Sequence, residues 1–370
     1  MKCVSPDYHA GLLNFMASVK NYFGLDNEYD TLAEADRFLA EKPDNVFVLL
    51  IDAMGSKILE KHLPADSFLR SHTVRNITTV YPSTTAAATT IFLTGMAPVS
   101  SGWMGWMEYF KEVDDFRILF LNRGYYTWHP YDDHLIEKTI VSQRHLPSQF
   151  ADAGKEMRII NPKFDPAGVK SIEEMTERIL TYANTFHNTY TYAYWDEFDM
   201  LLHEVGTDAP EVTEDLRRID KAVSRLAERL PAGNLLFVIA DHGQINVHTE
   251  DLTDHPDLMD TMIRKTALEA RCTVFYIKPG CEELFERLFK KYYGDAFELM
   301  RSRDFLKKYM GPFKPHKRVS DFLGTHVAAA RSNVSLACGN ERNLIGDHAG
   351  LTEDEMMVPL IVYRKEGDKI

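Results

Sequence analysis

Cysteine is scarce in this chain, and basic residues are fewer than acidic ones. The four cysteines show no paired spacing of the kind that holds a metal, and four are few for a secreted disulfide scaffold. We therefore expect reduced thiols and a cytoplasmic location. The formal net charge of -13 leaves no basic stripe to neutralise phosphates. This argues against a nucleic-acid polymer as partner and disfavours an anionic membrane surface.

Long apolar runs are also lacking. The longest uncharged stretch, residues 76–107, is rich in Ser and Thr and is broken by Pro82 and Pro98, so we interpret it as buried, site-forming chain and not as a membrane span. Pro6 and Asp7 stand where a signal peptide needs an unbroken apolar stretch, and we expect no export. What is present is a chain of 370 residues with 45% hydrophobic and 26% charged side chains, typical of a soluble globular protein.

Short apolar runs alternate with helical patterns over the front two thirds of the chain. The predicted strands are residues 46–51, 73–80, 117–121, 156–161, 190–195 and 235–240. The predicted helices between them are residues 56–62, 85–94, 171–184 and 212–229. This alternation predicts an α/β fold, with a mostly parallel central sheet and helices on both faces. In such sheets the ligand site lies beyond the carboxyl ends of the strands.

The pattern changes after residue 250. The segments 272–277 (CTVFYI) and 281–293, followed by FELMRSRDFLKKY and FLGTHVAAA, indicate a small α+β unit. We therefore predict a catalytic core formed by residues 1–250 and 335–370, and an inserted α+β cap formed by residues 251–334. The chain would leave the core, build the cap and return.

Residues with metal-binding or nucleophilic side chains recur at the ends of these elements. They are Asp52, Thr85, Asp199, His203, Asp241, His242 and His348. Carboxylate and imidazole are the ligands that a divalent metal such as zinc takes when thiolates are absent. Six such ligands can form two metal sites with three protein ligands each. Coordination positions then remain open for a hydroxyl and a substrate. The sequence thus outlines a two-metal hydrolase that acts on a small phosphorylated substrate.

Each of these residues also has an ordinary interpretation. Asp241-His242-Gly243 could be a polar strand-to-loop transition, and Asp52 could be a helix cap. Asp199 and His203, spaced i, i+4, could form a surface pair, with Asp196 and Glu197 as nearby competitors for the ligand role. His348 could be a loop histidine, and Asp347 beside it could be mistaken for the ligand. The metal hypothesis depends on the conjunction of all six.

Thr85 lies in YPSTTAAATTIFLTG, where an Ala-rich helix follows Pro82. Free backbone N–H groups at a helix start favour a phosphoryl group. The alternative is that Ser83, Thr84 or Thr85 only caps the helix. Metal coordination can lower the pKa of a threonine hydroxyl enough to make it a nucleophile. The aromatic side chains that follow are Trp103, Trp106, Tyr109 and Phe110, which form either a wall over the leaving group or ordinary packing.

Taken together, these motifs resemble the alkaline phosphatase superfamily, and specifically its type I phosphodiesterase / nucleotide pyrophosphatase branch. The resemblance covers residues 46–110, 190–245 and 343–363. It includes an Asp after the first strand, Pro-Ser-x-Thr with a later Thr-Gly, Asp-x-x-x-His, Asp-His-Gly and a late Gly-x-His. The resemblance implies two divalent metal ions, with zinc expected and manganese or iron as alternatives. One would be held by Asp199, His203 and His348, the other by Asp52, Asp241 and His242 with Thr85.

The resemblance selects Thr85 as the nucleophile and implies a covalent phosphothreonine intermediate. Trp106 stands where nucleotide pyrophosphatases carry an Asn, and the uncharged stretch lacks the arginine with which alkaline phosphatases grip a monoester. We therefore expect a phosphodiester or pyrophosphate substrate, with Thr84, Trp103 and Trp106 as substrate contacts. The alternatives are a phosphomonoesterase, a phosphonate hydrolase, a phosphomutase, or a metal-binding module without catalysis. The sequence leaves the oligomeric state open.

Overall fold

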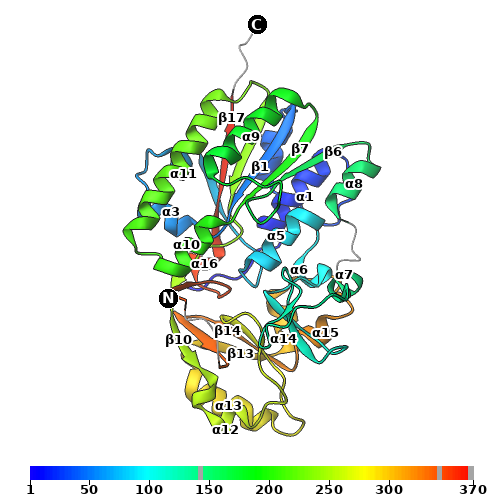
Figure 1. The fold of residues 1–370 in the computed structure, drawn as a ribbon, viewed down its shortest axis with the longest axis vertical. Coiled ribbons are helices and arrows are strands. Elements are labelled where there is room, and N and C mark those ends of the chain that lie inside the picture. Colours follow the sequence, from blue (N-terminus) through cyan, green and yellow to red (C-terminus); the bar gives the residue numbers. More distant parts are fainter. Residues whose placement is uncertain (141–144, 340–343, 366–370) are drawn as a thin grey trace.

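A six-stranded sheet forms the centre of the larger part of the molecule (Figure 1). The computed structural model describes residues 1–140, 145–339 and 344–365. The strands, in spatial order, are β2 (Thr73–Thr78), β17 (Met357–Arg364), β8 (Asn234–Ile239), β1 (Asn45–Ile51), β7 (Thr189–Trp195) and β6 (Glu156–Ile160). Only β17 is antiparallel to its neighbours, so the mostly parallel sheet is confirmed. Every residue of β1 and β8 is buried, as expected for strands covered on both faces.

Helices pack on this sheet in two groups whose members contact one another. One group comprises α3 (Ser56–His62), α4 (Phe68–Ser71), α9 (Ile172–Thr185), α10 (Glu197–Val205), α11 (Pro210–Arg229) and α16 (Glu353–Met356). The other comprises α1 (Leu12–Tyr22), α2 (Ala33–Leu39), α5 (Thr85–Thr94), α6 (Pro98–Ser101) and α8 (Leu146–Asp152). In α11, Val212, Leu216, Ile219 and Val223 are buried at three- and four-residue spacing, which is why this charged segment is helical. None of the helices in the described ranges is long and apolar enough to cross a bilayer.

A second, seven-stranded sheet forms the smaller part, drawn below the first in Figure 1. Its strands, in spatial order, are β13 (Phe297–Arg301), β14 (His326–Ala330), β12 (Cys272–Phe275), β11 (Ala267–Leu268), β3 (Met107–Phe110), β4 (Asp115–Ile118) and β5 (Arg123–Gly124). The helices beside it are α12 (Pro256–Met259), α13 (Glu282–Tyr293), α14 (Ser302–Tyr309) and α15 (Val319–Phe322).

Three strands of this second sheet precede residue 251, in the segment that the sequence analysis assigned to the core. β3 and β4 form an antiparallel pair, and Met107 of β3 pairs with Leu268 of β11. The smaller part is therefore built from two separate stretches of chain, not from residues 251–334 alone. The reason is long-range pairing: β4 was expected as a strand, but nothing local indicates which sheet a short strand joins.

A buried ion pair joins the two parts. Arg271, just before β12, donates from Nε and Nη2 to the carboxylate of Glu355 in α16 at 2.7 and 2.9 Å. Its remaining N–H groups reach the carbonyl oxygens of Ser332 and Val334 at 2.7 Å. Both charged side chains are fully buried, so each depends on the other for its hydrogen bonds. Glu355 also accepts from the N–H of Gly350, in the loop after His348.

We expect Arg271→Met to lower the free energy of unfolding by about 3–5 kcal/mol, because it leaves a buried carboxylate without its cation. Urea denaturation followed by circular dichroism measures the change. Lys2→Met is the matched control, since it breaks an exposed pair with Glu353, worth about 1 kcal/mol or less. Equal stability of the two variants would contradict the view that the pair of Arg271 and Glu355 holds the two parts of the molecule together.

Candidate active site

The first set of predicted ligands is Asp52, Asp241 and His242, which follow two adjacent parallel strands. β1 ends at Ile51 and is followed by Asp52, whose N–H donates to Trp195 O of the neighbouring β7 at 2.9 Å. β8 ends at Ile239, and Asp241 and His242 follow it. Because Leu50 of β1 is paired with Ile239 of β8, the polar residues beyond both strands come out at the same sheet edge. His242 Nε2 lies 3.4 Å from Asp52 and 3.5 Å from Asp241.

Asp241 is fixed by its backbone neighbours. Its Oδ1 accepts hydrogen bonds from the N–H groups of Ala53 and His242, both at 3.0 Å. Its Oδ2 is buried and has no hydrogen-bond partner among the described residues. Burial of a carboxylate oxygen without a hydrogen-bond donor costs free energy unless a cation binds that oxygen. Asp52 in turn accepts a hydrogen bond from the Tyr194 hydroxyl.

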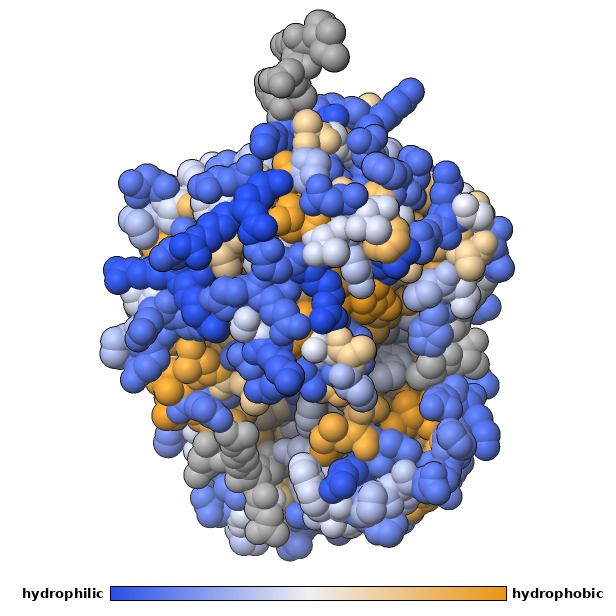
Figure 2. Space-filling model, turned by 45° about the horizontal axis from the view of Figure 1, so that its top comes forward, coloured by the Kyte–Doolittle hydropathy of each residue, from blue (hydrophilic) through white to orange (hydrophobic). Residues whose placement is uncertain are grey.

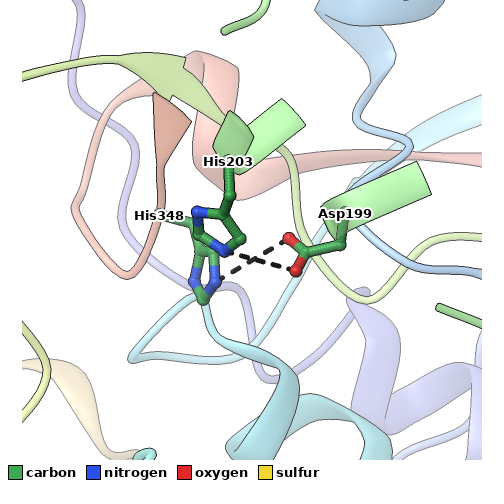
Figure 3. A group of neighbouring side chains, drawn as sticks. All are labelled: Asp199, His203 and His348. Atoms are coloured by element: carbon green, nitrogen blue, oxygen red, sulfur yellow. Dashed lines mark ion pairs between the residues drawn. The ribbon is translucent and has the colours of Figure 1, made fainter. Parts of the chain in front are cut away.

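The second set comes from α10 and from the loop after β16 (Gly346–Asp347) (Figure 3). Asp199 and His203, one helical turn apart, point toward His348. His203 Nε2 lies 3.2 Å from Asp199 Oδ2, and His348 Nε2 lies 3.9 Å from Asp199 Oδ1. His203 Nδ1 is 2.7 Å from Gly346 O; with the proton on Nδ1 it donates there and leaves the Nε2 lone pair toward the cluster. The ring of His348 stacks on that of His242 at 4.0 Å, so the two sets are contiguous.

Thr85 lies beside the first set, at the first position of α5. Its Oγ1 is 3.1 Å from His242 Nε2 and 3.4 Å from Asp52 Oδ1. The helix is ten residues long and begins after Thr84, which has extended backbone geometry. The first N–H groups of a helix have no partner within it, and Thr85 is the first residue of this helix. The structure therefore brings all seven predicted residues together.

Burial of like charges dominates the electrostatics of this cluster. Burial and then the charges of Asp241 and Asp199 raise the pKa of Asp52 well above its usual value. Burial likewise raises the pKa of Asp241 to about 7. Burial also lowers the pKa of His203, but Asp199 outweighs it and raises that pKa to about 10. Burial and the nearby His242 lower the pKa of His348 well below its ordinary value, so this imidazole stays neutral.

The donor set fits divalent metals. Ligand atoms of Asp199, His203 and His348 lie within 4.8 Å of one another, and so do those of Asp52, Asp199 and His242. Bound cations would neutralise the carboxylates and bind the neutral imidazole of His348. They would also give the Oδ2 atom of Asp241, which has no hydrogen-bond partner among the described residues, a positive partner. Asp199 belongs to both groups, a sharing that the sequence analysis did not anticipate. The metal-ligand roles themselves stay a prediction.

Strained backbone flanks the cluster. Ala53, directly after Asp52, has φ 59°, and Ala349, directly after His348, has φ 86°. Left-handed backbone at a residue other than glycine costs on the order of 1–3 kcal/mol and recurs at functional sites. After His242 the chain needs glycine for another reason, because a Cβ at Gly243 would lie 2.0 Å from Asp354 O.

A pocket of about 410 Å³ opens in front of the cluster. Figure 2 shows apolar side chains reaching the surface across the middle of one face of the molecule. The pocket is lined by Thr84, Thr85, Trp106, His203, Glu269 and His348, among others. Of the predicted substrate contacts, Thr84 and Trp106 therefore face it. Trp103 instead lines a separate cavity and packs on Phe120, with the ring centroids 5.0 Å apart.

Sequence reasoning missed three residues that contact the predicted site residues. Gln244 Nε2 donates to Asp199 Oδ1 at 2.7 Å, and its position two residues after His242 is a usable signal. Tyr194 near the carboxyl end of β7 could have been found from the same strand-end rule that selected Asp52. Glu269 accepts from the Thr84 hydroxyl at 2.6 Å, but no motif surrounds it in the sequence.

The fold is shared with several solved hydrolases. Murine ectonucleotide pyrophosphatase / phosphodiesterase 5, as an inactive threonine-to-alanine variant in complex with AMP, superimposes with a TM-score of 0.65 at 16% identity and covers 86% of this chain and 88% of its own. The human protein of that name gives 0.67 at 16%, with 86% and 89% covered. Phosphonoacetate hydrolase from Sinorhizobium meliloti, in complex with phosphonoacetate, gives 0.67 at 15%, with 100% and 95% covered. No curated protein matches the chain significantly in sequence.

These neighbours and the arrangement of the strands are those of the alkaline phosphatase superfamily. Within it, the sequence model of the type I phosphodiesterase / nucleotide pyrophosphatase family matches residues 46–321, and the chain belongs to this family. Membership identifies it as a phosphoric ester hydrolase and confirms the resemblance inferred from its motifs.

In protein stripped of metal by a chelator, we expect Asp241→Asn to raise the melting temperature, and more so at about pH 7.5 than at about pH 4.5. The folded-state pKa of Asp241 is raised from 3.8 to about 7, so its contribution to stability is lost as the pH rises between these values. The substitution removes that loss, so the rise in melting temperature should be larger at the higher pH. Differential scanning fluorimetry across pH measures it.

The sign of the effect should reverse when zinc is added. Zinc then stabilises the unsubstituted protein by binding the folded state, and Asp241→Asn weakens that stabilisation. Asp66→Asn is the control, at an exposed carboxylate outside the cluster. An Asp241 variant that is destabilised to the same extent at both pH values without metal would refute the account of buried charge.

Proposed function

We propose that this protein cleaves a phosphodiester or pyrophosphate with Thr85 as nucleophile, through a covalent phosphothreonine intermediate, at a site that holds two divalent metal ions. One observation carries the proposal. The Thr85 hydroxyl, at a helix N-terminus, lies 3.1 Å from His242 and 3.4 Å from Asp52, within a buried cluster of carboxylates and imidazoles. This is the combination of nucleophile and anion-binding backbone that phosphoryl transfer requires.

Six side chains would hold the metals, with zinc favoured by the mixed Asp/His donor set and manganese or iron as alternatives. Asp199, His203 and His348 would form one site, and Asp52, Asp241 and His242 the other, beside Thr85. When bound, the ions would supply positive charge to the phosphoryl oxygens and lower the pKa of the Thr85 hydroxyl.

The chain's own groups account for orientation and for the sequence of bonds. Thr85 Oγ1 attacks phosphorus in line, so that the Oγ1–P bond forms as the bond from phosphorus to the leaving oxygen breaks. Water then cleaves the Oγ1–P bond and restores the hydroxyl. Backbone N–H groups at the start of α5 lie next to Thr85 and can donate to the oxygens that gain charge.

The pocket lining favours a diester or pyrophosphate over a monoester. Among its described residues there is no Lys or Arg to bind a second negative charge. The AMP complex of the threonine-to-alanine murine neighbour supports a nucleotide-type ligand and a threonine nucleophile. Phosphonate hydrolysis is the second candidate, because the phosphonoacetate hydrolase neighbour covers the whole of this chain.

Thr85→Ala should reduce turnover of a nitrophenyl phosphodiester by about a thousandfold or more, because alanine lacks the hydroxyl that attacks phosphorus. Thr85→Ser should keep measurable activity, since it retains a hydroxyl. Steady-state kinetics on zinc-loaded protein, with the metal content determined by elemental analysis, measures both effects.

Thr181→Ala is the matched control, because Thr181 is an exposed residue of α9 whose hydroxyl only bonds within its own helix. It should leave turnover unchanged. Full activity of Thr85→Ala with its metal bound would remove Thr85 from the nucleophile role and, with it, the proposed mechanism.

A further inference from the structure

Glu269 contributes a carboxyl group to the pocket from the second sheet. It directly follows β11 and lines the same pocket as Thr85 and His203. The residue before it, Leu268, has φ 79°, a strained conformation for a branched side chain. The backbone is thus held in a rare conformation at the point where Glu269 enters the pocket.

The carboxyl of Glu269 binds two donors that adjoin the nucleophile. Its Oε1 accepts from the Thr84 hydroxyl at 2.6 Å and from the Trp106 N–H at 2.7 Å. Without Glu269 both donors would be free to bind an oxygen of the phosphoryl group at Thr85. A carboxylate accepts such bonds more strongly than a neutral group, so it competes well for them.

The pocket contains a second carboxyl group and, among its described lining residues, no Lys or Arg. Asp347 lines the same pocket, where its Oδ2 accepts from the Ser335 hydroxyl at 2.6 Å. Burial raises the pKa of Glu269 to about 8, so the group carries its negative charge at about pH 9. A second negative charge on an incoming phosphoryl group would be repelled by that carboxylate.

We propose that Glu269 determines substrate specificity by occupying the Thr84 and Trp106 donors with a carboxyl group, which disfavours phosphomonoester dianions and selects monoanionic diesters. This inference rests on the proposed function and names its substrate class. Glu269 acts on selectivity between substrates, whereas Thr85 and the ligand cluster carry out the bond cleavage common to both.

Three proteins test the proposal: the unsubstituted chain, Glu269→Gln and Glu269→Ala. Each is zinc-loaded and assayed at about pH 9 with nitrophenyl phosphate and a nitrophenyl phosphodiester. Gln keeps the acceptor for both donors and removes only the charge, so the diester-to-monoester ratio of kcat/KM should fall about 10–100-fold, mainly through a lower monoester KM. Ala also frees the donors and should lower the ratio further. Glu211→Gln, an exposed residue of α11, should leave the ratio unchanged.

A second readout does not require turnover. Inorganic phosphate, titrated calorimetrically into the zinc-loaded proteins, should bind Glu269→Gln about 10-fold or more tightly than the unsubstituted chain. Equal phosphate affinity, or parallel changes in diester and monoester kinetics, would overturn the role of Glu269. An active Thr85→Ala would instead overturn the nucleophile, while the phosphate titration still decides the question of Glu269. If Glu269→Gln does not fold, the phosphate titration is carried out with Glu269→Ala instead, and the same outcomes apply.

Discussion

Concentrated negative charge at one edge of a parallel sheet is the constraint on which the site depends. Asp52 and Asp241 follow adjacent strands, so the sheet cannot separate their carboxylates, and Asp199 enters the same space from α10. Burial makes each of Asp52 and Asp241 costly to ionise, whereas at Asp199 the charge of His203 outweighs burial and lowers the pKa. Bound cations would remove this cost. Metal binding would therefore be coupled to the stability of the core.

The two sheets contribute different parts of the site. The first sheet and its helices supply every predicted ligand except His348, and they also supply Thr85, the proposed nucleophile. His348 follows β16, which pairs with β9 (Ile245–Asn246) in a separate two-stranded sheet. The second sheet supplies Glu269, and β3 follows directly after Trp106, so the pocket wall belongs largely to it. The buried pair of Arg271 and Glu355 ties these halves together close to the loop of His348. The position of the pocket wall relative to the ligands is thus set by a charged contact in the interior.

The ligand cluster was predictable from the sequence because local rules produce it. A polar residue after a buried strand identifies Asp52 and Asp241, and helical spacing identifies Asp199 with His203. Glu269 was not predictable, because its role arises only when β11 pairs with β3, more than 150 residues away along the chain. Trp103 and Trp106 look equivalent in the sequence. In the structure Trp106 lines the pocket beside Thr85 and Trp103 lines a separate cavity, and no local pattern reveals this difference.

The proposed nucleophile, Thr85, and the residue bound by the proposed specificity determinant, Thr84, are neighbours in the chain. Thr85 belongs to the ligand cluster through His242 and Asp52, while the preceding Thr84 is bound by Glu269 of the second sheet. Thr84 and Thr85 are joined by one planar peptide unit, so a backbone shift at Thr84 also moves the backbone of Thr85. A displacement of the second sheet that moves Glu269 would therefore act directly beside the proposed nucleophile. The buried pair of Arg271 and Glu355, which joins the second sheet to the larger part of the molecule, opposes such a displacement.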